Sequence, residues 1–208
     1  NLDSYFKANY SDIDMKLKLS LFLQTINGVS FLHSYNVIHR DLKPPNILIK
    51  TLERFKSPTV KICDFGFSKI TEHSRQSMST KLGTELFMSP EHYDPSQKYT
   101  KSVDIFASGL VFLSVTQAIQ GQSLIPRAEG ISINDPGYGT TIGQAILFHH
   151  RLHKKHPTLY GPLQVTIVTQ TDSKTEQEVK HLITDMTLFD QLQRPSANDI
   201  EGRLSKVR

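Results

Sequence analysis

The sequence of 208 residues contains one cysteine and no tryptophan. Because Cys63 has no second cysteine to pair with, an internal disulfide framework is excluded, and with it the small disulfide-rich class of secreted proteins. A lone thiol fits a reducing compartment, so we expect a cytoplasmic location for this segment. Attachment of a longer parent protein to a membrane elsewhere is compatible with this expectation.

The sequence also has little excess of one charge sign over the other. Lysine and arginine number 24 and aspartate and glutamate 20, which leaves a net charge of +4. That excess suits ligands that carry phosphate but is too small to indicate nucleic acid, and we expect no nucleic-acid partner. With 38% hydrophobic residues, the chain is long enough and apolar enough for one globular domain with a buried core.

One stretch without charge, residues 105–126, has the length of a membrane span. It contains seven serine, threonine and glutamine residues, whose polar groups would all need partners inside a bilayer. We therefore predict a helix buried in protein and no membrane insertion by this segment.

Hydrophobic spacing predicts a mainly α fold with small β elements. Apolar residues recur at three- and four-residue steps in 12–34, which indicates a long helix. Short apolar runs predict strands at 37–38, 47–49 and 59–63, and the polar segment 67–84 has the pattern of a mobile loop. Further helices are expected at the following places: 2–6, 102–118, 141–152, 176–186 and a last helix capped by Ser196.

Two motifs carry the chemistry. His-Arg-Asp-Leu-Lys-Pro-Pro-Asn occupies residues 39–46, and Asp-Phe-Gly follows at 64–66. They supply a base, a cation and two oxygen ligands for Mg²⁺, in the order and spacing that phosphoryl transfer from ATP uses. An isolated His-Arg-Asp would mean little, whereas the later asparagine and the second acidic triplet make a chance match improbable.

These motifs occur with others in a fixed order: Gly83-Thr84, Ser89-Pro90-Glu91, Val103-Asp104-Ile105-Phe106 and Arg194-Pro195. The set resembles the large, C-terminal lobe of the eukaryotic protein kinases, and Lys43 before Pro44 resembles the serine/threonine branch. The resemblance implies a protein-kinase-like large-lobe fragment over residues 1–208. Its catalytic loop would be 37–49 and its activation segment 64–91.

The resemblance also implies the catalytic residues, which are Asp41, Lys43 and Thr84. Asp41 would accept the proton of the attacking hydroxyl or orient it, and Lys43 would neutralise charge on the transferring phosphoryl group. Thr84 stands where the family has a threonine at the substrate site, and it would bond the other two.

ATP and Mg²⁺ are the implied cofactors. Asn46 and Asp64 would hold the metal, because hard oxygen ligands suit Mg²⁺. Lys43, Asn46, Leu48 and Asp64 would together bind the nucleotide. For Leu48 two interpretations stay open, a place beneath the adenine ring or plain core packing.

Other positions resemble structural parts of the family. Asp104 would accept hydrogen bonds from the backbone of residues 39–40, and Glu91 and Arg194 would form a buried ion pair. Arg40 would then meet a phosphate on the activation loop. His39 and Phe65 resemble a buried spine. Candidate phosphorylation sites lie on the loop: Ser74, Ser77, Ser79 and Thr80.

The histidine-rich run 149–156 invites a metal interpretation, since His149 and His153 would share a helix face. Arg151 and the lysines at 154 and 155 oppose a cation, and no cysteine or carboxylate joins them. A solvated basic face is the favoured interpretation.

The family's N-terminal lobe is absent: no glycine-rich loop and no lysine–glutamate pair precede residue 39. We expect that missing lobe and a protein with a Ser or Thr acceptor as partners, and little or no transfer by this segment alone. A binding or scaffold module without catalysis is the alternative, and a small-molecule phosphotransferase is another. A narrower resemblance, at residues 83–85 and 99–106, is to the stress-sensor kinase–endoribonucleases.

Overall fold

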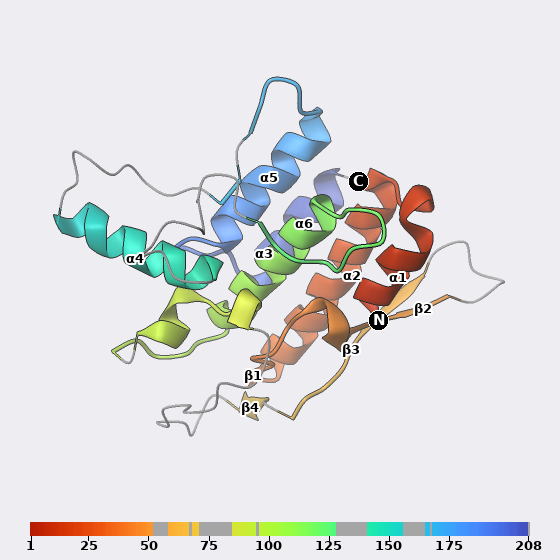
Figure 1. Cartoon of the computed structure of the whole chain (residues 1–208). Helices are drawn as coiled ribbons and strands as arrows, with labels where there is room; N and C mark the ends of the chain where they lie inside the picture. The colour runs from red at the N-terminus through yellow and green to blue at the C-terminus, as the bar shows by residue number, and fades with distance from the viewer. Residues whose placement is uncertain are drawn as a thin grey trace.

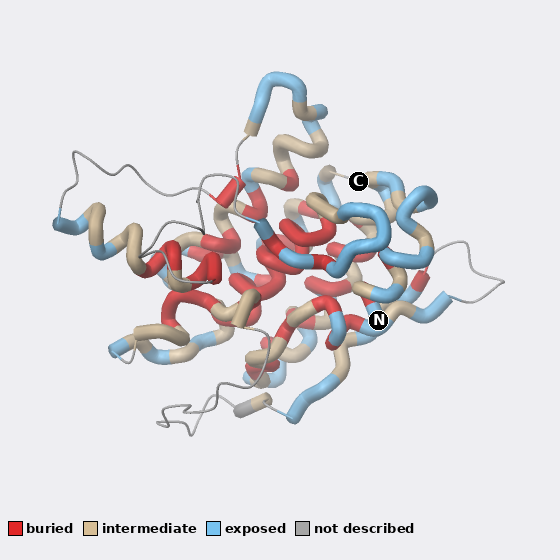
Figure 2. Tube along the Cα trace, viewed as in Figure 1, coloured by how far each residue is buried: buried red, intermediate tan, exposed pale blue. Residues whose placement is uncertain are grey.

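The computed structural model describes residues 1–51, 58–66, 68–70, 85–94, 96–127, 141–155, 165–166 and 168–207. Its centre is α3 (Ser102–Thr116), in which every side chain from Val103 to Val115 is buried. The longer α2 (Met15–Ser34), together with α5 (Lys174–Met186) and α6 (Ala197–Val207), packs around it (Figure 1). Figure 2 shows the buried residues gathered at this centre. The predicted mainly α class is confirmed.

The apolar stripe of α2 faces α3. Phe22 of α2 stacks on Phe112 of α3 with ring centroids 4.0 Å apart, and both rings are buried. The helix begins three residues later than predicted, because Asp14 caps it by accepting a hydrogen bond from Leu17 N at 2.7 Å. Before it lie α1 (Leu2–Asn9) and the short 3₁₀ turn η1 (Tyr10–Asp12).

Two small antiparallel sheets carry the motifs. β2 (Ile47–Lys50) pairs with β3 (Thr59–Ile62), with Ile47 opposite Ile62, and η2 (Pro44–Asn46) directly precedes β2. β1 (Val37–Ile38) pairs with β4 (Lys69–Ile70). The predicted loop over 67–84 is therefore wrong at 69–70, where the edge of β1 supplies a backbone partner that no local pattern reveals. Residues 71–84 lie outside the described part.

Between β4 and α3 lie η4 (Glu85–Phe87) and η5 (Pro90–Tyr93), and α4 (Ile142–Lys155) follows α3. The predicted cap of α6 is confirmed. Ser196 Oγ accepts from Asp199 N at 3.2 Å, and Asp199 Oδ2 accepts in return from Ser196 N at 3.0 Å. Residues 165–166 form a bend.

The uncharged stretch beginning at residue 105 is largely α3, which lies inside the protein as predicted. Within the ranges listed above, no helix combines the length and apolar character that crossing a bilayer requires.

Candidate active site

A buried carboxylate fixes the backbone of the His-Arg-Asp motif. Asp104, at the start of α3, is 1% exposed, and its two oxygens accept hydrogen bonds from His39 N and Arg40 N, each at 2.8 Å. Arg40 has a φ of 73°, a left-handed conformation that costs energy for a side chain with a Cβ. The two bonds to Asp104 hold this turn, which confirms the predicted anchor.

His33 is a third partner of Asp104, which the sequence motifs did not predict. Its Nε2 lies 3.0 Å from Asp104 Oδ2, and its side chain is almost completely buried. The sequence did carry a signal, since His33 continues the buried stripe of α2 through Ile26 and Val29 at three- and four-residue steps.

Asp41, Lys43 and Asn46 form one cluster. Lys43 Nζ lies 2.8 Å from Asp41 Oδ2, and Asn46 Nδ2 donates to the same oxygen at 3.0 Å and to the main-chain oxygen of Asp41 at 2.8 Å. Because both bonds use the amide nitrogen, Asn46 Oδ1 is the atom left to coordinate a cation. All three side chains are at least partly withdrawn from water.

The β2–β3 pairing brings Asp64 to the same end of the hairpin as Asn46. Cys63 N donates to Asn46 O at 2.9 Å, so the residues just before β2 and just after β3 are bonded neighbours. Asp64 is exposed and has a φ of 66°. Its carboxylate lies over Gly66, where an added Cβ would come within 3.4 Å of Asp64 Oδ1.

His39 ties the two motifs together. Its Nδ1 accepts from Asp41 N at 3.3 Å, while its Nε2 lies 2.9 Å from the main-chain oxygen of Cys63. These contacts fit a neutral imidazole with the proton on Nε2. Phe65 lies beside the His39 ring, 5.3 Å between centroids, but is 48% exposed. The expected burial holds for His39 and is wrong for Phe65.

Of the predicted site residues, Leu48 is described by the structure and Thr84 is not. Leu48 on β2 is 42% exposed, so it is not plain core. Thr84 lies outside the described residues, and so do the candidate phosphorylation sites of the loop.

The ion pair between Glu91 and Arg194 is confirmed. Arg194 Nη1 and Nη2 lie 2.6 and 2.9 Å from the two carboxylate oxygens, and both side chains are buried. The guanidinium also lies 4.9 Å from the Phe106 ring. Close by, α4 approaches the same segment so tightly that a Cβ at Gly143 would lie 2.2 Å from Met88 O.

Arg40 points to Tyr99, with its guanidinium carbon 5.9 Å from the ring centroid. Burial lowers the pKa of Arg40, against the attraction of Asp104, and burial raises the pKa of Tyr99. The pKa of the nearby His92 is lowered, again mainly by burial. The expected phosphate partner of Arg40 would come from the loop outside the described residues.

The donor set at the end of the β2–β3 hairpin fits Mg²⁺. One amide oxygen and one carboxylate are hard ligands, and Mg²⁺ typically completes its shell with water and substrate phosphates. In the described part of the chain, no three or more His, Cys, Asp and Glu residues gather together. In the histidine-rich run, the ring of His150 stacks on that of Phe189 at 3.6 Å between centroids.

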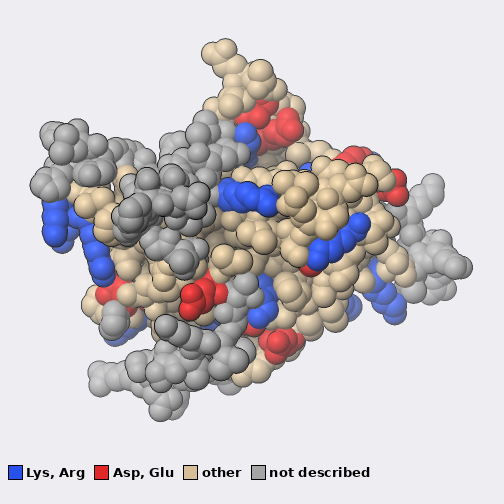
Figure 3. Space-filling model, viewed as in Figure 1, with Lys and Arg blue, Asp and Glu red and all other residues tan. Residues whose placement is uncertain are grey.

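Charge does not gather into one basic surface on the face in Figure 3, where the Lys and Arg side chains form separate groups among Asp and Glu. This distribution is consistent with the modest net charge.

Comparison with known proteins identifies the family of the chain. The family model described as the protein kinase domain matches residues 2–203. Cyclin-dependent kinase-like 2 of Pongo abelii is 35% identical over 151 residues, which are 72% of this chain and 28% of that protein. The same protein of Homo sapiens is 34% identical over 151 residues, with the same two shares, and that of Mus musculus 34% over 149 residues, 72% of this chain and 25% of the relative.

The chain thus spans about a quarter of the length of these relatives, 25–28%. The narrower likeness to the stress-sensor kinase–endoribonucleases stays a prediction. The order of the motifs, the geometry around Asp41 and the match over residues 2–203 agree, and the chain belongs to the protein kinase family, with similarity to its serine/threonine branch.

Proposed function

We propose that the protein containing this chain transfers the γ-phosphoryl group of ATP to a serine or threonine hydroxyl of a protein substrate. The observation that carries the proposal is the convergence on Asp41 Oδ2, which lies within hydrogen-bonding distance of both Lys43 Nζ and Asn46 Nδ2. A carboxylate fixed in this way can orient an attacking hydroxyl without swinging away.

Lys43 has two tasks in this proposal. Its ammonium pairs with Asp41 Oδ2 at 2.8 Å. When ATP binds, the same ammonium lies near the phosphoryl group in transfer and offsets charge that builds up on its oxygens. Thr84 is proposed to bond both side chains from the activation segment.

Asn46 and Asp64 are proposed to hold Mg²⁺, which supplies charge neutralisation between the ATP phosphates. Support comes from Asn46 Oδ1, which neither of the two bonds to Asp41 uses, and from the exposed carboxylate of Asp64, at the same end of the hairpin. The exposed Leu48 on the same hairpin is proposed as the floor for the adenine ring.

A small lobe in the parent protein is proposed to cover this face. Two large apolar side chains of the motif segments are exposed, Leu48 at 42% and Phe65 at 48%. Such exposure is typical of a surface that another domain or protein covers. We accordingly propose that residues 1–208 alone transfer phosphate weakly or not at all. From the single cysteine we separately propose that the parent works in a reducing compartment.

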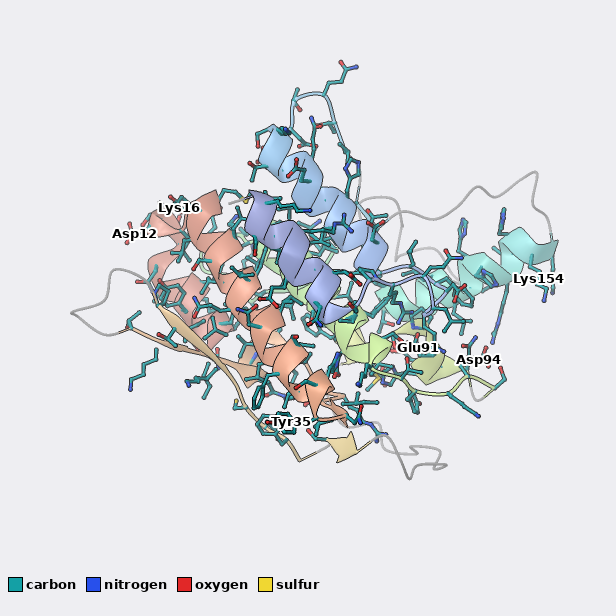
Figure 4. The ribbon with its side chains drawn as sticks, turned by 180° about the vertical axis from the view of Figure 1, so that it is seen from behind. Asp12, Lys16, Tyr35, Glu91, Asp94 and Lys154 are labelled. Carbon is teal, nitrogen blue, oxygen red and sulfur yellow. The ribbon has the colours of Figure 1, made fainter. Side chains whose placement is uncertain are left out.

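Transfer of labelled γ-phosphate to a protein substrate by the parent protein tests the proposal. Asp41→Asn and Asp64→Asn should each reduce kcat by about a hundredfold or more, since base catalysis and charge stabilisation each contribute at least that factor. Asp12→Asn, at an exposed site near the start of α2 and outside both motifs (Figure 4), is the matched control. Wild-type turnover in either site variant would refute the assignment.

The alternative is a kinase-like lobe that binds partners without catalysis. It is favoured for the isolated segment by the same exposed apolar side chains. Titration of the parent with ATP and Mg²⁺ separates the two, because a scaffold has no need to bind the nucleotide.

A further inference from the structure

A cavity of about 470 Å³ lies between the C-terminal half of α2, the start of α3 and the start of α6. In Figure 4, α2 and α6 run side by side, and Ser30 of α2 donates a hydrogen bond to Asn198 Oδ1 of α6 across the gap. The volume of the cavity falls within the range that is usual for small-molecule sites, roughly 300–1,000 Å³. None of Asp41, Lys43, Asn46 and Asp64 lines it.

The described lining holds three basic side chains and no carboxylate. Two of the three are already engaged. Arg194 directs its donors to Glu91 and to three main-chain oxygens, and His33 bonds Asp104. The polar atoms of both side chains are therefore occupied by partners within the protein, and both side chains have a carboxylate partner.

Lys101 is different. Its Nζ donates to Asn36 Oδ1 at 2.8 Å, which is a neutral partner, and no described carboxylate lies within ion-pairing distance of it. An ammonium has three N–H donors, so two are available after Asn36. The positive charge of Lys101 is consequently not neutralised at this cavity.

Asn198 supplies the second donor. Because Ser30 occupies its Oδ1, the amide nitrogen is the end of the side chain that can donate to a ligand. The positive ends of α3 and α6 also meet here and add to the field; Ser196 caps α6, whereas the side chain at the N-cap of α3 makes no capping hydrogen bond.

We propose that this cavity binds a phosphate monoester, with its oxygens accepting hydrogen bonds from Lys101 Nζ and Asn198 Nδ2. A phosphate ester suits the site because several strong acceptor oxygens can meet an ammonium and an amide together. A small metabolite and a phosphorylated side chain of another protein present this same group, and the experiment distinguishes them.

Occupation of the cavity has a route to the candidate active site. His33 in its wall bonds Asp104, which fixes the backbone of His39 and Arg40. Arg194 in the same wall holds Glu91 of the activation segment. A ligand that stiffens this wall would favour the ordered catalytic loop. This regulatory consequence rests on the proposed function, whereas binding does not.

Calorimetric titration of the protein with four probes tests the binding. The probes are glycerol 3-phosphate, glycerol, a phosphoserine peptide and the same peptide without phosphate. We expect saturable binding of at least one phosphate ester and none of its unphosphorylated counterpart. Lys101→Gln and Asn198→Asp should each weaken it about tenfold or more, as loss of a charge-assisted hydrogen bond does. Lys98→Gln, an exposed lysine outside the lining, should leave it unchanged.

Tighter binding of glycerol 3-phosphate would identify a metabolite site, and tighter binding of the peptide a phosphoprotein site. Asn198→Asp keeps an acceptor for Ser30, so it tests the idea even where Lys101→Gln fails to fold. Asp64→Asn should bind the esters like wild type, which separates this proposal from the kinase proposal. The phosphate-site proposal would be overturned if neither ester bound saturably. It would also be overturned if Lys98→Gln weakened binding as much as Lys101→Gln does.

Discussion

Asn46 donates from its amide nitrogen to both the main-chain oxygen and the carboxylate of Asp41, at 2.8 and 3.0 Å. This pairing fixes the proposed base and at the same time turns the Asn46 oxygen away from it. One side chain thus links the positioning of Asp41 to the proposed binding of metal.

Asn46→Asp should therefore impair the protein more than its small size suggests. The new carboxylate has no donor for Asp41 and repels it, so we expect kcat of the parent to fall about tenfold or more while the fold is retained. Phosphoryl-transfer kinetics measure the effect. Asn27→Asp, an exposed change on α2, is the control and should leave kcat unchanged. Equal kinetics for the two variants would contradict the pairing's importance.

Breaking the pair between Glu91 and Arg194 should destabilise the fold strongly. Glu91→Gln leaves the buried guanidinium without its counter-charge, and we expect the free energy of unfolding to fall by about 3 kcal/mol in urea titrations. Arg203→Met breaks the exposed pair with Asp185, 2.7 Å, and should cost less than about 1 kcal/mol. A loss of similar size in both variants would argue against the buried pair.

Gly143→Ala should be harmful because of the close approach of α4 to the backbone at Met88. A Cβ there would lie 2.2 Å from Met88 O, so α4 must move, and we expect a loss of about 2 kcal/mol or more. Gly202→Ala on α6 has no heavy atom within 4 Å of its Cβ. It should stabilise the protein by about 0.5–1 kcal/mol. Thermal melts compare the two, and equal melting temperatures would refute the packing argument.

His92 should make stability depend on pH. Burial lowers its pKa in the folded state, outweighing the attraction of Glu91 and Asp104. Below the ordinary value of about 6.5, the unfolded chain binds a proton that the folded chain resists. The stability contribution is complete above that pH, shrinks as the pH falls, and is lost once the pH reaches the lowered pKa. Urea titrations from pH 7.5 to 5.5 should show a flatter dependence for His92→Gln. Parallel curves for wild type and variant would contradict this.

The chain of polar residues at the site was predictable because each lies in a short motif of fixed spacing. Asn46 and Asp64 lie at the same end of the hairpin because β2 and β3 pair, and both strands have the apolar pattern of strands. Asp104 and the Glu91–Arg194 pair followed from the family's motifs, as the contacts confirm.

Contacts made between distant elements were not predictable. β4 forms only because β1 offers an edge, and Arg40 meets Tyr99 only because η5 and the start of α3 place that ring there. The exposure of Phe65 could not be predicted from the sequence pattern either, since an apolar residue in a motif is expected to be buried. In each case tertiary packing, and not local sequence, decides the outcome.

The central claim is that Asn46 and Asp64 together bind the metal of a nucleotide complex. The most direct measurement uses Mn²⁺ with ATP in place of Mg²⁺ and records paramagnetic broadening of amide signals in the parent protein. We predict the strongest broadening at the Asn46 side-chain amide and the Asp64 main-chain amide, and its loss in Asp64→Asn. Broadening centred on His149 and His153, with the Asn46 signal unchanged, would contradict the account.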